Sequence, residues 1–195
     1  MSVRDVKFDE DLIRRYDRSG PRYTSYPTAV QFTDEFGLEE YRTAAKASNE
    51  DPIPRPLSIY VHVPFCSSPC FYCGCTKVIT RNHERAEAYL RRLYREIELQ
   101  GQLYDPDREV EQLHFGGGTP TFLTSREIDD LIGKFGQHFK MSGDPGREYS
   151  IELDPRTITR ETLHDLYDVG FNRCSLGIQD FDPAVQQAVN RIQSV

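Results

Sequence analysis

Two kinds of apolar pattern alternate along the chain after residue 56. Short runs rich in apolar and β-branched residues predict strands at residues 57–63, 110–115, 148–153 and 172–178. Each run is followed by a segment whose apolar residues recur at helical spacing. Strand, loop and helix thus occur four times, which favours a parallel sheet with helical crossovers. We expect an α/β fold containing four strand–helix units of a partial barrel, half of an eightfold barrel or two-thirds of a sixfold one.

Signals at the ends of the predicted helices support this pattern. Thr124 and Glu127 form a capping-box pair at the start of the second helix. Gly170 stands where a glycine ends the third helix. Asp182 followed by Pro183 provides an N-cap and a first-turn proline for the fourth. The helices therefore have defined ends as well as apolar faces.

Residues 1–56 differ from this pattern and predict an extension. Residues 8–16 and 36–47 favour two helices, the second with Phe36, Tyr41 and Ala45 on one face. The segment between them contains a glycine and two prolines, which indicates an irregular arm. Three prolines between residues 52 and 56 predict a stiff linker. We therefore expect an N-terminal extension and arm at 1–56 and the first part of a barrel domain at 57–195.

Composition narrows the class of protein. The 195 residues are 37% hydrophobic and 28% charged, which is typical of a soluble globular protein. The formal net charge of −7 disfavours binding to nucleic acid or to anionic lipid. The first twenty residues contain no apolar run, and no segment reaches the roughly 20 apolar residues of a membrane span. We expect a cytoplasmic protein with no membrane partner.

Unusual residues follow all four predicted strands. A cysteine-rich loop follows the first, Gly116–Gly118 the second, Glu152 ends the third, and Gln179 with Asp180 follows the fourth. Barrel enzymes build their active sites at the carboxyl ends of their strands. The sequence therefore predicts one site at that edge of the sheet.

The cysteine loop reads CSSPCFYCGC, with cysteines at 66, 70, 73 and 75. Three close thiolates on one short loop suit three irons of a [4Fe–4S] cluster, and they leave the fourth iron open to another molecule. A structural zinc site is the alternative, but it prefers four ligands in two separated pairs. Unreactive buried thiols are also disfavoured, since four of them cannot readily pack inside one Gly/Pro loop.

The Cys-x3-Cys-x2-Cys motif after a strand resembles the radical S-adenosylmethionine (SAM) superfamily. YVHVPFCSSPCFYCGC, together with GPRYTSYPT, LHFGGGTPTFL, SIELDPR, FNRCSLGIQDF and VNR, resembles its oxygen-independent coproporphyrinogen III oxidase family. The match extends from about residue 12 to 191. It implies that a 5′-deoxyadenosyl radical from SAM initiates decarboxylation of two propionates of coproporphyrinogen III, giving protoporphyrinogen IX for haem synthesis.

The resemblance also implies roles for individual residues. Cys66, Cys70 and Cys73 would be the metal ligands of the cluster, and Cys75 would be a catalytic residue that is not a ligand. Two SAM molecules would share the site. The residues matching the family's SAM contacts are Tyr60, Tyr72, Gly117, Gly118, Thr119, Glu152, Gln179 and Arg191. Arg22, in the irregular arm, is a candidate for binding a substrate propionate, because guanidinium pairs with carboxylate.

Several of these residues also have simpler interpretations. Tyr60 could be a core residue, because strands favour aromatics, and the triple glycine could be only a turn. Glu152 lies in an apolar run and therefore needs a functional or ion-pair partner. By composition alone Arg191 is a surface charge. His62 lies between Val61 and Val63, which favours a packed and hydrogen-bonded histidine, and Cys174, in the fourth predicted strand, is most simply a core thiol.

Two other functions stay open. A related radical SAM haem-binding protein without decarboxylase activity would generally lack the fourth cysteine and the PRYTSYPT arm, which are both present. A non-catalytic metal-binding module is the other. We expect a monomer that uses an electron donor of unknown identity. The resemblance implies that the rest of the barrel and a C-terminal domain lie beyond Val195, so residues 1–195 alone should not turn over substrate.

Overall fold

The computed structural model of the protein describes residues 8–19 and 28–194. The chain separates into two compact units, with the boundary between Tyr41 and Arg42. Arg22 lies outside the described residues.

The first unit contains the first of the two helices predicted in the extension and the start of the second. Helix α1 spans Glu10–Tyr16, and the Asp9 carboxylate caps it by accepting from the Leu12 amide at 2.9 Å. A 3-10 turn at Ala29–Gln31 follows. Helix α2, Leu38–Ala47, begins in this unit and ends in the second. Ala45 is buried in it, but Phe36 is exposed because the helix begins two residues after it, so the predicted common face was wrong for Phe36.

The second unit is built on a parallel sheet whose strands follow each other in chain order. Its order is β1-β4-β6-β7, comprising Leu57–Val63, Glu109–Gly117, Glu148–Leu153 and Arg173–Leu176. The short strand β5, Lys140–Met141, pairs with the start of β4. Two further short strands, β2 at Phe65–Cys66 and β3 at Val78–Ile79, form a separate parallel pair. The predicted α/β class and all four strands are confirmed.

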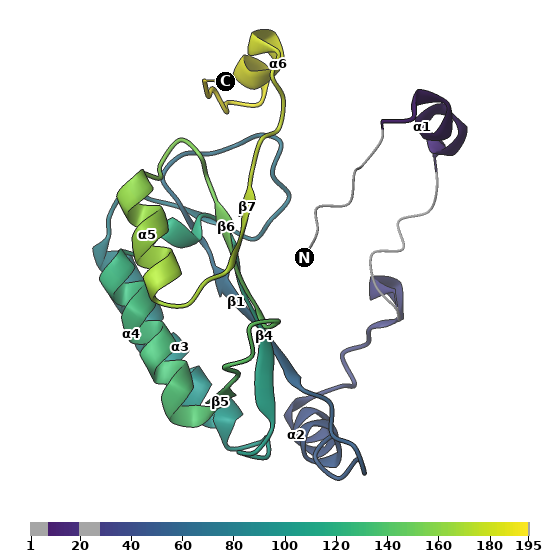
Figure 1. The fold of residues 1–195 in the computed structure, drawn as a ribbon, viewed down its shortest axis with the longest axis vertical. Helices are drawn as coiled ribbons and strands as arrows, with labels where there is room; N and C mark the ends of the chain where they lie inside the picture. The colour runs from purple at the N-terminus through teal and green to yellow at the C-terminus, as the bar shows by residue number, and fades with distance from the viewer. Residues whose placement is uncertain (1–7, 20–27, 195) are drawn as a thin grey trace. The chain divides into compact units, whose positions relative to one another are not determined.

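Helices follow the strands as predicted. They are α3 at Glu84–Gly101, α4 at Ser125–His138, α5 at Arg160–Asp168 and α6 at Pro183–Ala188, with a 3-10 turn at Pro120–Phe122. Helices α3, α4 and α5 cover one face of the sheet, whereas α6 lies beyond the carboxyl end of β7 (Figure 1). The helical connections between parallel strands all have the same hand. Because successive strands are added on the same side of the growing sheet, their helices all lie on one face, as in a barrel. The described strands form an open sheet.

The core lies between the sheet and these three helices. Leu113 and Phe115 of β4 are fully buried, and Ile128, Leu131 and Phe135 of α4 pack above them. The Phe115 ring contacts the Phe135 and Phe171 rings edge to face, with the Phe171 centroid at 5.3 Å. Such edge-to-face contacts add to the stabilisation from apolar burial.

The helix ends predicted from sequence are confirmed. Glu127 N donates to the Thr124 hydroxyl at 3.2 Å, and the Thr124 amide donates to the Glu127 carboxylate at 2.8 Å, which completes the capping box. Gly170 has φ +109°, and it ends α5 as expected. Asp182 accepts hydrogen bonds from the Ala184 and Val185 amides at the start of α6.

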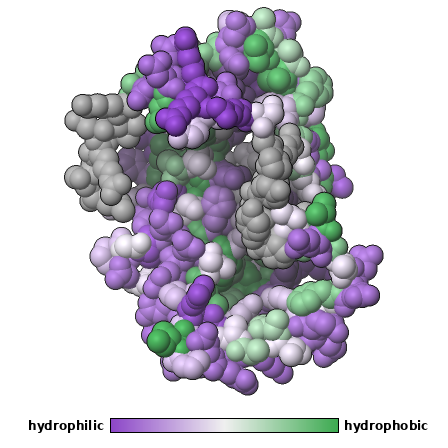
Figure 2. Space-filling model, turned by 90° about the vertical axis from the view of Figure 1, so that its right-hand side faces the viewer, coloured by the Kyte–Doolittle hydropathy of each residue, from purple (hydrophilic) through white to green (hydrophobic). Residues whose placement is uncertain are grey.

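The other face of the sheet is polar. Gln112, His114, Ser150 and Glu152 project from its two central strands, and Gln112 and His114 bond across to β6. Figure 2 looks at the molecule from the right-hand side of Figure 1, and most of the coloured surface in that view is hydrophilic. No helix in the described residues is both long and apolar enough to cross a membrane. The sheet thus separates an apolar core from a polar face.

Cys174 is exposed, so its interpretation as a core thiol was wrong. The residue lies in β7, all four of whose residues are exposed. Helix α6 is short and lies past the end of β7 rather than over it (Figure 1), so it does not cover this side chain.

Candidate metal and cofactor site

A cavity of about 340 Å³ opens at the carboxyl ends of the strands. Its lining combines the cysteine loop after β1, the glycine turn after β4, and residues after β6 and β7. The volume falls within the ~300–1,000 Å³ of typical ligand sites. The prediction that the four strand ends converge on one site is confirmed. The predicted residues that line it are Cys66, Cys70, Cys73, Cys75, Tyr72, Gly117, Gly118, Thr119, Glu152, Gln179 and Arg191.

The cysteine loop is closed at its base. Strands β2 and β3 pair on either side of it, the Val78 amide donates to the Pro64 carbonyl at 2.7 Å, and the Thr80 amide donates to the Cys66 carbonyl at 2.9 Å. The cysteines after Cys66 lie on the part of the loop beyond this base. The pairing of β2 with β3 therefore fixes the position of Cys66. The positions of Cys70, Cys73 and Cys75 depend on other contacts.

All four cysteines of the loop are free thiols. Cys66, Cys70 and Cys73 are half-buried, and Cys75 is exposed. The Cys75 amide donates to the Cys73 sulfur at 3.4 Å. Burial raises the pKa of Cys73, but hydrogen bonds from the Cys75 amide and thiol, together with the nearby Lys77 ammonium, outweigh it, so the pKa is lowered overall. Thiolates are soft ligands that suit iron or zinc.

Within the described residues, no three His, Cys, Asp or Glu side chains are grouped closely enough to hold a single metal ion. A [4Fe–4S] cluster has a different requirement, because each of its cysteine ligands binds a different iron and the thiols need not meet at one point. The outer part of the loop is exposed, including Phe71 at 73% and Tyr72 at 67%.

The glycine turn packs directly against the start of the cysteine loop. The Gly118 amide donates to the Val63 carbonyl and the Thr119 amide to the Phe65 carbonyl, both at 2.8 Å. A Cβ on Gly118 would lie 2.7 Å from the Phe65 carbonyl oxygen, and Gly117 has φ +111°. Both positions therefore need glycine for packing and backbone conformation. The Thr119 hydroxyl also donates to the Cys66 sulfur at 3.7 Å.

His62 connects β1 to the far end of the cysteine loop. Its Nε2 lies 2.9 Å from the Thr76 carbonyl oxygen, which can only accept, so Nε2 carries the proton. Its Nδ1 therefore accepts from the Tyr60 hydroxyl at 3.0 Å. Burial, with smaller contributions from Glu152 and Cys75, raises the pKa of Tyr60 and keeps this donor protonated. The prediction of a packed, hydrogen-bonded His62 is confirmed.

Tyr60 is not part of the cavity lining, and it is not a core residue either. Its side chain is 57% exposed on the polar face, where it stacks on the His114 ring with the centroids 5.7 Å apart. His114 in turn donates from Nε2 to the Glu152 carboxylate at 3.4 Å. Glu152 also accepts from the Gly117 amide at 3.1 Å, so this carboxylate has the partners its apolar neighbours required.

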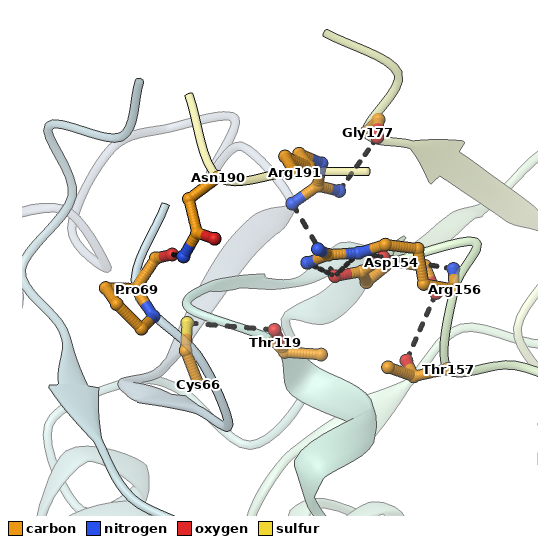
Figure 3. Close-up of polar contacts among 9 residues, drawn as sticks. All are labelled: Cys66, Pro69, Thr119, Asp154, Arg156, Thr157, Gly177, Asn190 and Arg191. Carbon is orange, nitrogen blue, oxygen red and sulfur yellow. Dashed lines mark hydrogen bonds and ion pairs between the residues drawn. The ribbon is translucent and has the colours of Figure 1, made fainter. Parts of the chain in front are cut away.

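An ion-pair cluster that the sequence reasoning did not predict forms one wall of the cavity. Asp154 is 7% exposed and accepts from Arg156 at 3.0 Å (Nε to Oδ1) and 2.6 Å (Nη2 to Oδ2). Arg191 Nη1 lies 3.5 Å from the same Oδ2, and Nη2 donates to the Gly177 carbonyl at 2.8 Å (Figure 3). Burial raises the pKa of Asp154, but Arg156 and Arg191 outweigh it and lower the pKa overall.

This cluster corrects one interpretation and adds two residues. The Arg191 side chain is only 12% exposed, so its interpretation as a surface charge was wrong: Asp154 attracts it inward. Asp154 and Arg156 directly follow the strand at 148–153. Their position just after the end of this strand could have identified them, because the sequence predicts the site at the carboxyl ends of the strands. Two guanidinium groups against one carboxylate leave excess positive charge at this wall, which suits an anionic ligand group.

Comparison with known proteins places this site in a family. Residues 60–195 match the model of the radical SAM superfamily. Curated relatives include oxygen-independent coproporphyrinogen III oxidases of Pseudomonas aeruginosa, 50% identical over 97% of this chain, and of Escherichia coli, 46% identical over 99%. The chain spans 41% of the length of each of these relatives.

A solved structure is also similar. Coproporphyrinogen III oxidase (HemN) from Escherichia coli, described as a radical SAM enzyme, matches 97% of this chain and 40% of its own length, with a TM-score of 0.79 and 41% identity. Fold, motif and family model agree over more than half of the chain. The chain therefore belongs to the radical SAM superfamily, which implies a [4Fe–4S] cluster and SAM as cofactors.

Proposed function

We propose that this protein catalyses the oxygen-independent oxidative decarboxylation of two propionates of coproporphyrinogen III, giving the vinyl groups of protoporphyrinogen IX. The observation that carries the proposal is the single cavity that unites the cysteine loop, the glycine turn and the ends of β6 and β7. The relatives named oxygen-independent coproporphyrinogen III oxidase, at 50% and 46% identity, supply the reaction. Since the chain spans 41% of their length, the activity is proposed for the full-length protein.

The cluster would be held by Cys66, Cys70 and Cys73. The residues present fit it, because these three free, half-buried thiols line one cavity and the loop that carries them is closed at its base. Cys75 would not be a ligand. Its side chain is exposed and lines the cavity, so it would be available to take part in the reaction as a catalytic residue.

SAM would be held by Tyr72 and by the cavity residues on the opposite wall. These are Gly117, Gly118, Thr119, Glu152, Gln179 and Arg191, with Tyr60 contributing from the polar face. The excess positive charge around Asp154 provides a place for the carboxylate of SAM. We further propose that two SAM molecules share the site and that these residues divide between them.

When bound, the reduced cluster and SAM would supply the removal of a hydrogen atom from the β-carbon of a propionate; loss of CO2 to leave a vinyl group then releases one electron, which a separate electron acceptor would take up. The chain's own residues bind, orient and shield. Glu152 is fixed by the Gly117 amide and by His114, so its remaining acceptor capacity faces the cavity in a set direction. Pre-organised polar groups of this kind position a substrate at little further entropic cost.

Substrate and partner assignments complete the proposal. Arg22 would bind a propionate of the tetrapyrrole, in keeping with the bidentate pairing of guanidinium and carboxylate. The protein would act as a cytoplasmic monomer that receives electrons from a separate donor. The net charge of −7 supports the absence of a nucleic-acid or membrane partner.

Anaerobic turnover of coproporphyrinogen III by the full-length protein, with SAM and a chemical reductant, tests the proposal. We expect protoporphyrinogen IX to form and a Cys75→Ser variant to retain its iron without forming product. Formation of 5′-deoxyadenosine with no loss of CO2 from coproporphyrinogen would contradict the assigned substrate. Tight haem binding in that case would identify the related haem-binding class instead.

A further inference from the structure

Two hydrogen bonds from the end of α6 reach the cysteine loop, one on each side of Cys70. The Asn190 side-chain amide donates to the Pro69 carbonyl at 2.7 Å (Figure 3), and the Phe71 amide donates to the Val189 carbonyl at 3.0 Å. Asn190 and Pro69 are 121 residues apart in sequence. The segment that carries the middle cysteine is therefore attached to an element from the other edge of the sheet.

Asn190 occupies a special backbone position. It has φ 55°, and within the described residues it is the non-glycine residue with positive φ. The Asn190 amide bonds to the Gln187 carbonyl at 3.1 Å and the Arg191 amide to the Gln186 carbonyl at 2.8 Å, which is the Schellman ending of a helix. Glycine usually fills this position, and asparagine is the common substitute because it tolerates the left-handed region. Glycine would end the helix equally well but could not bond to Pro69.

The element that carries Asn190 is firmly held. Gln186 is 5% exposed, and its side chain donates to the Asp180 carbonyl at 2.8 Å and accepts from the Gln193 amide at 3.0 Å. Arg191 is bonded to the Gly177 carbonyl and paired with Asp154. The donor amide of Asn190 is therefore presented from a fixed point.

The loop around Cys70 has few other attachments. Its base is closed by β2 and β3, and the bond from Arg81 reaches only as far as Ser67, at 3.4 Å. Beyond Cys70, the Cys73 amide bonds back to the Cys70 carbonyl at 3.2 Å, which is a contact within the loop. For Pro69–Phe71 in the described structure, the bonds to elements outside the loop are thus the two from Val189 and Asn190.

We propose that Asn190 is a positioning residue for the cluster loop, whose side-chain amide sets the place of the Cys70 thiol. The inference deepens the proposed function and rests on its assignment of Cys70 as a ligand. Without the amide, the outer loop is attached by the Phe71–Val189 bond alone. Because Arg191 is the next residue, the same short segment links the cysteine loop to the ion-pair wall of the cavity.

Three variants separate the amide from the backbone position. Asn190→Gly keeps the left-handed conformation and removes the amide. Asn190→Asp keeps size and tolerance for positive φ, but it sets an acceptor against the Pro69 carbonyl. Asn190→Ala removes the amide and also strains the helix end. Gly170→Asn is the matched control, because it makes the reverse change at the same position of α5, with no heavy atom closer than 4.0 Å to the new Cβ.

The first measurement is hydrogen exchange of the Phe71 amide in the metal-free, full-length protein. We expect exchange about tenfold faster in Asn190→Gly and Asn190→Asp, the loss typical of one hydrogen bond. The Arg191 amide in Asn190→Gly, and the Phe71 amide in Gly170→Asn, should exchange as in the wild type. Unchanged Phe71 exchange in Asn190→Gly, with a slower-folding or less stable Asn190→Ala alone, would overturn the proposal and leave Asn190 as a helix-ending residue.

The second measurement follows the reconstituted protein. Iron release to a chelator should be several-fold faster in Asn190→Gly and Asn190→Asp, and the electron paramagnetic resonance signal of the reduced cluster should broaden. Equal iron release in the wild type and both variants would overturn the link to Cys70. Failure of the wild type itself to take up iron would instead contradict the proposed function, and the exchange experiment would still decide the role of the amide.

Discussion

Helices α5 and α6 end with the same backbone motif, but α5 ends near the amino ends of the strands and α6 near their carboxyl ends. The residue that carries the motif also differs. In α5 the Gly170 amide bonds to Tyr167 and the Phe171 amide to Leu166, and in α6 Asn190 and Arg191 make the equivalent bonds. Gly170 precedes β7 at the amino edge, and Asn190 lies at the cavity. At the end of α5, glycine adopts the left-handed conformation with the least strain. At the end of α6, beside the cavity, asparagine takes this position, and its side chain makes a hydrogen bond of its own.

The same contrast divides the whole sheet. On its helix side, Phe115, Leu113 and Leu131 have no polar partners to satisfy and are fully buried. At the carboxyl edge, free thiols, Asp154 and Arg191 are held by individual polar contacts. Substitutions on the helix side should therefore change stability, and substitutions at the carboxyl edge should change binding before they change stability.

The contrast between the helix side and the carboxyl ends of the strands is tested most sharply by variants that lose the cluster and keep the fold. Replacing Cys66, Cys70 or Cys73 by serine should each reduce the iron bound after reconstitution nearly to zero, because a hydroxyl is a poor ligand for iron in such clusters. Thermal unfolding of the metal-free protein should hardly change, since these thiols are only half-buried. Cys75→Ser is the control and should keep its iron. Equal iron loss in Cys75→Ser and Cys70→Ser would show that the ligands are assigned wrongly.

The core counterpart is Phe115→Ala. The ring is fully buried between Phe135 and Phe171, so its removal should lower the free energy of unfolding by about 3–5 kcal/mol. Urea unfolding of the full-length protein measures this loss. Iron uptake at low temperature, where the variant stays folded, should match the wild type. A loss below about 1 kcal/mol would mean that the site collapses to fill the space.

Asp154→Asn should affect both stability and the site, because this residue is buried and also forms part of the cavity wall. At pH 7 it should reduce the free energy of unfolding by about 1–3 kcal/mol, since two guanidinium groups lose a charged acceptor. The lowered pKa of Asp154 means that its contribution is present above the ordinary value of 3.8 and is lost as pH falls through the folded-state value. The difference between the two proteins in urea unfolding should therefore shrink below about pH 4. A difference that grew on acidification would contradict the pairing.

The smallest expected effect is at Thr124, which caps α4 and is not among the residues that line the cavity. Thr124→Ala removes the hydroxyl that accepts from the Glu127 amide and should cost about 1 kcal/mol of unfolding free energy. Thr124→Ser is the matched control and should stay within a few tenths of a kcal/mol of the wild type. Iron uptake should be unchanged in both. Weaker iron uptake in Thr124→Ala would indicate that α4 transmits strain to the glycine turn.

Much of the fold and part of the site could be predicted because their signals are local. The capping box at Thr124 and Glu127, the glycine at 170 and the cap at Asp182 depend on neighbours within a few residues, so the sequence determines them directly. The cysteine spacing is local too, since all four lie within ten residues. The carboxyl-edge site followed from chain order alone, because parallel strands bring their carboxyl ends to one edge.

The tertiary structure decided what depends on distant segments. Composition suggested an exposed Arg191, and a place in a predicted strand suggested a buried Cys174. Asp154 instead draws the arginine inward, and the short α6 leaves the cysteine uncovered. The bond from Asn190 to Pro69 crosses 121 residues and exists only because β7 and α6 bring the chain back over the loop. Periodicity and spacing describe a residue's neighbours along the chain. Burial and pairing are set by its neighbours across the sheet, and these are fixed only when the strands have assembled.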